Sequence, residues 1–227
     1  MHKRIIILGT GGNCIDILDT INAINETRRP GTYECVGFLD ENEQNWGKKH
    51  YGVAVLGPLK SAMVYSDHVF VNGIGSEFNF WKKRAIISTT NVPDDRFETI
   101  IHPSASVSSM ARLGYGTVIF QNVTITSHVK IGNHVMVLPN SVISHDDVIG
   151  DYTCVAGGVC ISGGVTVGHS CYLGTNSAVM GNVKIGDYCL IGMGSVVLAS
   201  VDDNQVMVGN PARLLRYTTP EGQRTEG

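Results

Sequence analysis

The chain has 227 residues, of which 43% are hydrophobic and 16% charged, and its formal net charge is -3. This length suffices for one large domain or two small ones. The charge balance leaves no basic excess to attract nucleic acid or a membrane surface. No apolar run approaches the ~20 residues of a membrane span, and the short run 5–8 ends in glycines instead of a cleavage site. We therefore expect a cytoplasmic protein.

Strand-like and helix-like segments alternate in the N-terminal part. An apolar run at 3–8 leads into the glycine-rich turn 9–13, and apolar residues then recur at helical spacing from Ile15 to Ile24. Further strands and a helix are expected at 34–39, 53–56, 68–72 and 81–88. Such alternation predicts a small α/β domain with a Rossmann-like parallel sheet.

From residue 101 onward, a branched aliphatic residue recurs at every sixth position. The seventeen positions hold only Ile, Val or Leu: 101, 107, 113, 119, 125, 131, 137, 143, 149, 155, 161, 167, 173, 179, 185, 191 and 197. A period of six with an aliphatic anchor is typical of a hexapeptide β-helix, in which three hexapeptides form one triangular coil and the anchors stack inside. The sequence therefore predicts an all-β, left-handed parallel β-helix with coils of eighteen residues.

Glycines and cysteines follow the same repeat. Five glycines stand eighteen residues apart, each directly after an anchor, at 114, 132, 150, 168 and 186. We expect them at corners that need a positive φ. Cys171 and Cys189 each precede an anchor by two residues, so they should stack inside the coil. No cysteines show a CxxC spacing, and we interpret all six as reduced thiols.

The change of pattern divides the chain into an N-terminal domain at 1–98, the β-helix at 99–205 and a C-terminal tail at 206–227. A solenoid must cover its ends, and we expect the N-terminal domain to cover the first coil. Flat triangular prisms pack side by side with cyclic symmetry, which favours a homotrimer.

Four features together resemble the bacterial nucleotide-sugar acetyltransferases of the PglD and NeuD type. They are the GxGG turn at 9–12, the FLDE segment at 38–41, hexapeptide repeats with a His–acid pair, and GNPAR at 209–213. The resemblance covers nearly the whole chain. It implies a nucleotide-sugar-binding N-terminal domain, an acyltransferase β-helix and acetyl-CoA as co-substrate, with no metal.

The catalytic base of that family is a coil histidine followed by an acid, which the segment 141–150 (SVISHDDVIG) matches here. The resemblance makes His145 the general base and Asp146 the acid that supports it. One coil beyond His145 stands Gly163, so the repeat by itself places these two residues side by side. In the family, the N–H of this glycine faces the thioester oxygen of the donor.

The resemblance also assigns residues that bind the two substrates. Acetyl-CoA is expected at Gly163, Cys154, Thr175, Met193 and Arg213, with Arg216 as a second candidate for its phosphates. The nucleotide sugar is expected at Gly11, Gly12, Asn13, Asp40, Glu41 and Gly75. The chain departs from the family pattern at Asn13 and Cys154, where the family has histidine, and at Leu138, where it has asparagine.

The leading hypothesis is an acetyl-CoA-dependent N-acetyltransferase that modifies the amino group of a nucleotide-linked sugar, of the UDP-4-amino-4,6-dideoxy class, in surface glycan or O-antigen lipopolysaccharide biosynthesis. O-acetylation of a sialic-acid-type hydroxyl is the close alternative. A β-helix carbonic anhydrase is disfavoured because no two of His128, His134, His145 and His169 stand one coil apart. A non-catalytic nucleotide-sugar binder stays open.

Overall fold

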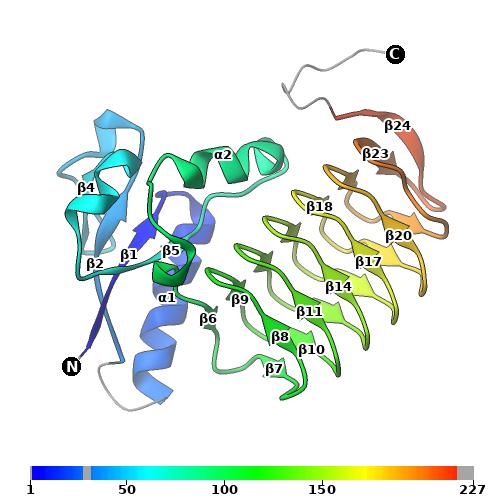
Figure 1. Ribbon diagram of the computed structural model, residues 1–227, viewed down its shortest axis with the longest axis horizontal. Coiled ribbons are helices and arrows are strands. Elements are labelled where there is room, and N and C mark those ends of the chain that lie inside the picture. The colour runs from blue at the N-terminus through cyan, green and yellow to red at the C-terminus, as the bar shows by residue number, and fades with distance from the viewer. Residues whose placement is uncertain (1, 28–31, 219–227) are drawn as a thin grey trace.

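The computed structural model describes residues 2–27 and 32–218, which form a small parallel sheet domain followed by a long stack of coils (Figure 1). The sheet contains β1 (Lys3–Leu8), β2 (Tyr33–Leu39), β4 (Val53–Gly57) and β5 (Val69–Asn72), all parallel, and β3 (Lys49–His50) pairs antiparallel with β4 at one edge. The strand order is β3-β4-β2-β1-β5. The strands predicted at 3–8, 34–39, 53–56 and 68–72 are confirmed.

The N-terminal domain contains helices of two kinds. α1 (Gly12–Thr27) confirms the predicted helix after the glycine-rich turn and buries Ile17, Ile21 and Ile24. The helix predicted at 81–88 begins as a 3-10 turn at Phe80–Lys82 and continues as α2 (Lys83–Ser88). Three more 3-10 helices lie at Glu43–Asn45, Leu59–Val64 and Asp94–Arg96.

The seventeen predicted anchors each end a two-residue strand, in order from β6 to β22. These strands are β6 (Ile100–Ile101), β7 (Ser106–Val107), β8 (Arg112–Leu113), β9 (Val118–Ile119), β10 (Thr124–Ile125), β11 (Lys130–Ile131), β12 (Met136–Val137), β13 (Val142–Ile143), β14 (Val148–Ile149), β15 (Cys154–Val155), β16 (Cys160–Ile161), β17 (Thr166–Val167), β18 (Tyr172–Leu173), β19 (Ala178–Val179), β20 (Lys184–Ile185), β21 (Leu190–Ile191) and β22 (Val196–Val197). The period of six is thereby confirmed.

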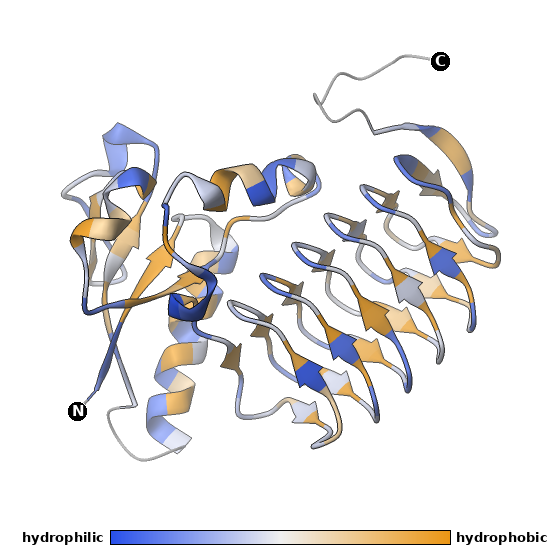
Figure 2. Ribbon diagram, in the orientation of Figure 1, coloured by the Kyte–Doolittle hydropathy of each residue, from blue (hydrophilic) through white to orange (hydrophobic). Residues whose placement is uncertain are grey.

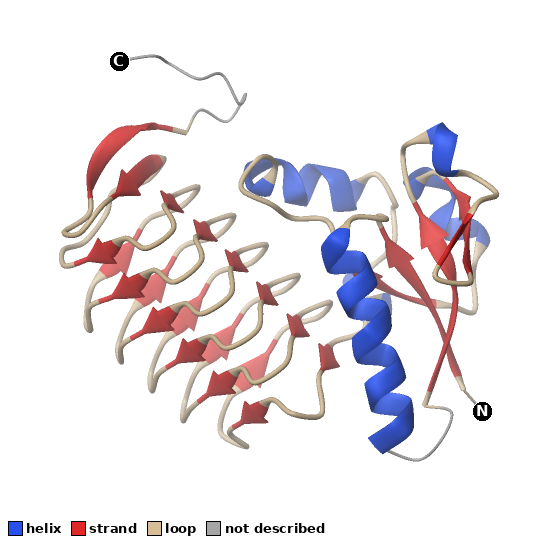
Figure 3. Ribbon diagram, turned by 180° about the vertical axis from the view of Figure 1, so that it is seen from behind, coloured by secondary structure: helices blue, strands red, loops and turns tan. Residues whose placement is uncertain are grey.

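The coils stack into three parallel sheets, which we name the β6, β7 and β8 sheets after their first strands. Each strand pairs with the strand one coil away, as Ile125 does with Val107 and Ile143. The anchors and the inward Cys171 and Cys189 form one continuous core, as predicted. Figure 3 shows the three rows of strands from behind. Left-handed winding, Rossmann-like character and the exact domain limits stay predictions.

The predicted reason for the five post-anchor glycines is wrong. None of these glycines has a positive φ; a Cβ atom on each would lie within 3 Å of backbone atoms in the next coil. Close approach of the stacked chains therefore requires glycine there. The positive-φ residues stand instead at every sixth position from 116 to 194, where Asn is frequent and where His128, His134 and Asp146 also occur.

The β6 sheet faces the N-terminal domain. Side chains of α1 share a core with Ile100, Val118 and Met136 of this sheet, and α1 lies against the first coils in both views (Figures 1 and 3). Beyond the last coil, β23 (Gln205–Val208) and β24 (Arg213–Tyr217) extend the same sheet as a hairpin. No helix among the described residues is long and apolar enough to cross a membrane.

Candidate active site

The predicted His–acid pair lies at the corner between β13 and β14. The His145 Nδ1 is 2.9 Å from the Asp146 Oδ2, which leaves Nε2 directed elsewhere. Both side chains are largely exposed, at 65% and 59%. The hydrogen bond to His145 lowers the pKa of the Asp146 carboxyl, so this group is a carboxylate at neutral pH. Such a pair can orient an imidazole and stabilise its protonated form, as a general base requires.

Gly163 lies directly against the His145 ring. A Cβ atom at this position would come 2.5 Å from the ring Cε1 and 2.6 Å from Nε2. The neighbouring N–H of Gly164 donates to the His145 carbonyl at 2.9 Å, which fixes the register of the two coils. The juxtaposition expected from the eighteen-residue coil is therefore present, and only glycine allows the ring this position.

A second histidine reaches the same acid. The His128 Nδ1 is 3.4 Å from the Asp146 Oδ1, so the carboxylate bridges two imidazoles. His128 was assigned no catalytic or binding role from the sequence. The signal was present, because His128 and Asp146 stand eighteen residues apart and share the positive-φ corner position.

His134 likewise received no site role from the sequence, and the structure buries it. Its ring is only 1% exposed, stacks on Tyr152 with 5.2 Å between centroids, and places Nε2 3.2 Å from the Asp94 Oδ1. Burial lowers the pKa of this imidazole. His134 therefore packs the N-terminal domain against the first coils. Among the described residues, no three His, Cys, Asp or Glu side chains gather as a metal site.

Asp147 points into the coil beneath the pair. Its Oδ1 accepts a hydrogen bond from the Val165 N–H at 2.7 Å, whereas Oδ2 is buried without a partner. Burial raises the pKa of this carboxyl to about 6. The equivalent inward positions in the preceding and following coils hold valines, Val129 and Val165. The acid therefore adds a titratable group directly under the candidate active site.

All six residues predicted to bind the nucleotide sugar line one pocket of about 510 Å³ in the N-terminal domain: Gly11, Gly12, Asn13, Asp40, Glu41 and Gly75. The pocket opens where β1, β2 and β5 end and α1 begins. Parallel strands place their carboxyl ends at one edge, and a helix N-terminus there favours a phosphate or carboxylate.

Hydrogen bonds hold the walls of this nucleotide pocket. The Asn13 Nδ2 donates to the Gly75 carbonyl at 3.0 Å, and the Thr10 hydroxyl donates to the Asp40 Oδ2 at 2.7 Å. The Glu41 Oε1 accepts the Leu59 N–H at 3.0 Å. Asn13, where the family has histidine, therefore joins two loops. Ser76 and Asn79, which follow the predicted Gly75 in the chain, also line the pocket and were not predicted to bind the nucleotide sugar.

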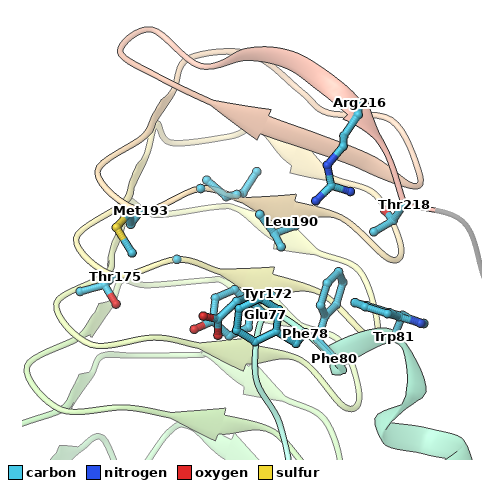
Figure 4. Close-up of a pocket in the computed structure, with 13 residues that line it drawn as sticks. Glu77, Phe78, Phe80, Trp81, Tyr172, Thr175, Leu190, Met193, Arg216 and Thr218 are labelled. Atoms are coloured by element: carbon cyan, nitrogen blue, oxygen red, sulfur yellow. The ribbon is translucent and has the colours of Figure 1, made fainter. Parts of the chain in front are cut away.

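The residues predicted to bind acetyl-CoA do not all lie together. Thr175 and Met193 line a second pocket, of about 410 Å³, on the β6 sheet near the last coils, with Arg216 at its rim (Figure 4). Gly163 lies at the His145 corner. Arg213 is exposed and donates to the Ala212 carbonyl. Aromatic residues that the sequence did not single out complete this second pocket: Phe78, Phe80, Trp81 and Tyr172.

Cys154 is closed off from solvent in this arrangement. Its thiol is buried, lies 3.9 Å from the Lys83 Nζ, and would meet a Cβ atom on Gly75 at 2.9 Å. Burial raises the pKa of this thiol and lowers the pKa of the Lys83 ammonium. Burial therefore disfavours the charged form of each group. Cys154 serves the contact between the two domains.

Comparisons with known proteins agree with this arrangement. Residues 4–86 match the PglD N-terminal domain, and residues 164–199 match the bacterial transferase hexapeptide family (six repeats). The chain therefore contains a PglD-type N-terminal domain followed by transferase-type hexapeptide repeats. No curated protein sequence matches it.

Solved structures with the same architecture are numerous. The acetyltransferase domain of PglB from Neisseria gonorrhoeae FA1090 is 20% identical, with 94% of this chain and 100% of that chain covered and a TM-score of 0.81. PerB from Caulobacter crescentus, solved with CoA and GDP-perosamine, is 25% identical, with 92% and 96% covered and a TM-score of 0.78. WeeI from Acinetobacter baumannii AYE is 24% identical, with 94% and 100% covered and a TM-score of 0.79. The chain therefore shares its fold with all three.

Proposed function

We propose that this PglD-type protein is an acetyl-CoA-dependent N-acetyltransferase that modifies the amino group of a nucleotide-linked sugar. The observation that carries the proposal is the His145–Asp146 pair with Gly163 against the imidazole. The PglD-type nucleotide pocket supplies the acceptor class. PerB, a structural neighbour, was solved with CoA and an amino-sugar nucleotide.

In the proposed reaction, the amine attacks the carbonyl carbon of the acetyl thioester, and the His145 Nε2 takes the proton that the amine loses. Asp146 holds Nδ1 and stabilises the imidazolium that forms. The thioester oxygen becomes negative as the C–N bond forms, and the Gly163 N–H is the candidate donor to it; one such donor is typically worth about 3 kcal/mol. Collapse of the intermediate breaks the C–S bond, and the thiolate of CoA takes up the proton. No acyl-enzyme forms.

The acceptor is proposed to bind with its nucleotide in the pocket around Asp40, and the donor to extend from Gly163 toward Thr175 and Met193. These groups occupy different sides of one chain: the nucleotide pocket lies on the β6-sheet side, whereas His145 lies at the corner between the β7 and β8 sheets. We therefore propose that the nucleotide pocket of a second copy meets the His145 corner, as the predicted homotrimer would allow. The 4-amino-4,6-dideoxy sugar and the role in cytoplasmic surface-glycan synthesis belong to the same proposal.

Acceptor screening tests this function. Purified protein would be incubated with acetyl-CoA and UDP- or GDP-linked 4-amino sugars, and with sialic acids as hydroxyl acceptors, while CoA release and product mass are followed. Acetylation of an amino-sugar nucleotide is expected. Turnover of hydroxyl acceptors alone would favour the O-acetyltransferase alternative, and binding of nucleotide sugar without any turnover would make the protein a non-catalytic binder.

A further inference from the structure

Two cations stand side by side on the outer face of the β8 sheet. Arg112 of β8 and Lys130 of β11 are register partners on neighbouring parallel strands, and both are exposed. Figure 2 colours β8 and β11 partly hydrophilic on this face, whereas β14 beyond them is hydrophobic. Two of the three cationic strand residues of this sheet therefore stand on its first two strands, whereas the third, Lys184, lies apart from them on β20.

Like charges on adjacent strands repel each other and destabilise the pairing. Within the part of the chain that the structure describes, neither the Arg112 guanidinium nor the Lys130 ammonium has a hydrogen bond or ion pair from its side chain. Together with His128 and Met110 they surround a hollow of about 210 Å³. An anion in this hollow would relieve the repulsion, and a guanidinium matches a phosphate group particularly well.

The hollow is connected to the candidate active site by direct contacts. His128 on its wall is 3.4 Å from the Asp146 Oδ1, and the other oxygen of Asp146 holds His145. Neighbouring strands lie about 4.8 Å apart, so Lys130 lies about one strand spacing and Arg112 about two spacings from β14, where the His145 corner ends. That span fits a sugar ring between an amine at His145 and a phosphate at the two cations.

We propose that Arg112, Lys130 and His128 form an anion subsite for the diphosphate of the nucleotide-linked acceptor, which holds the sugar amine against His145. The inference rests on the proposed function. The diphosphate of CoA is the other source of the same chemistry. The acceptor is favoured because the cations expected to meet the donor's phosphates, Arg213 and Arg216, lie beyond the last coil, in the opposite direction from His145.

Binding of inorganic pyrophosphate tests the subsite without catalysis. Titration calorimetry would compare the full-length protein with Arg112→Gln/Lys130→Gln and with Lys184→Gln, an exposed lysine of β20 on the same sheet. We expect the double variant to bind pyrophosphate at least about tenfold more weakly, because two charge-assisted contacts are lost, and the control to bind normally. Equal binding by all three proteins would overturn the proposal.

Kinetics separate the two sources of phosphate. In the double variant, KM for the nucleotide sugar should rise about tenfold while KM for acetyl-CoA stays constant; a rise in KM for acetyl-CoA alone would assign the site to the donor and overturn the acceptor assignment. Failure of the wild-type protein to acetylate any amino-sugar nucleotide would refute the proposed function. Pyrophosphate binding that depends on Arg112 and Lys130 would still support an anion subsite in that case.

Discussion

In the β-helix, His145 and Gly163 stand one coil apart in the sequence and touch in space, whereas in the N-terminal domain Asn13 and Gly75 stand 62 residues apart and are joined by a hydrogen bond. The first contact follows from a period that the sequence displays. The second depends on the order in which β1, β2 and β5 assemble. In a repetitive fold, an active-site contact can therefore be predicted from the spacing of two residues in the sequence. In a sheet domain, the contacts depend on the order of the strands, which residue spacing does not reveal.

The largest expected effect concerns the candidate catalytic base in the β-helix. His145→Ala should lower kcat by about 10²- to 10⁴-fold, because the amine loses its proton acceptor, while KM for either substrate changes little. Steady-state kinetics with acetyl-CoA and the best acceptor measures this. His169→Ala is the matched control, since that histidine also contacts an aspartate, with Nε2 3.1 Å from the Asp187 Oδ2. Near-normal acetylation by His145→Ala would show that His145 is not the general base.

Gly163→Ala tests the contact between Gly163 and the His145 ring, which the eighteen-residue period predicted. The added methyl group would overlap the imidazole and move it, and a displacement of about 1 Å at a reacting group can cost about 100-fold in rate. Gly157→Ala is the control, because its Cβ would meet only the Pro139 carbonyl, at 3.4 Å. Equal rates for the two variants would show that the position of the His145 ring is not limiting. Thermal melts of both variants check the fold.

Asp40→Asn tests the nucleotide pocket of the N-terminal domain, whose contacts depend on the order of the strands. The carboxylate accepts from the Thr10 hydroxyl and the Asn42 N–H in the wall of the nucleotide pocket. Loss of its charge should raise KM for the nucleotide sugar about tenfold, since hydrogen bonds to charged groups contribute about 1.5–3 kcal/mol. KM for acetyl-CoA should not change. The exposed Asp67 serves as control through Asp67→Asn, and an unchanged acceptor KM for Asp40→Asn would argue against nucleotide binding there.

The smallest expected effect concerns stability. Because the pKa of Asp147 is raised to about 6 in the folded protein, the folded state binds this proton more tightly than the unfolded chain. Stability contributed by the neutral acid is present at pH 4 and is lost as the pH rises toward 6 and above, by an amount on the order of 2 kcal/mol.

Asp147→Ser should reduce this dependence of stability on pH. Serine at the equivalent inward position of another corner, Ser141, accepts the Val159 N–H in the same way that Asp147 accepts the Val165 N–H. Urea denaturation of both proteins at pH 4.5 and 7.5 measures the difference. If the stability of Asp147→Ser depends on pH as strongly as that of the wild-type protein, other groups cause the dependence.

Much of the fold could be predicted because its signals are local. The seventeen anchors defined every strand from β6 to β22, and the family resemblance selected six residues that line one pocket. The explanation of the post-anchor glycines failed because period alone does not distinguish a positive φ from a close contact between coils. The burial of His134 was not predicted, because its partners Tyr152 and Asp94 come from another coil and another domain.

The sequence by itself determined the period, the inward column of aliphatic residues and the neighbourhood of His145 and Gly163, because a repeating chain returns to the same position after every coil. Only the tertiary structure decided which surfaces meet. The packing of the N-terminal domain against the β6 sheet buries Cys154 and Lys83, and it brings Asp94 to the buried His134. These contacts depend on side chains that approach each other from separate elements, for which no local pattern exists.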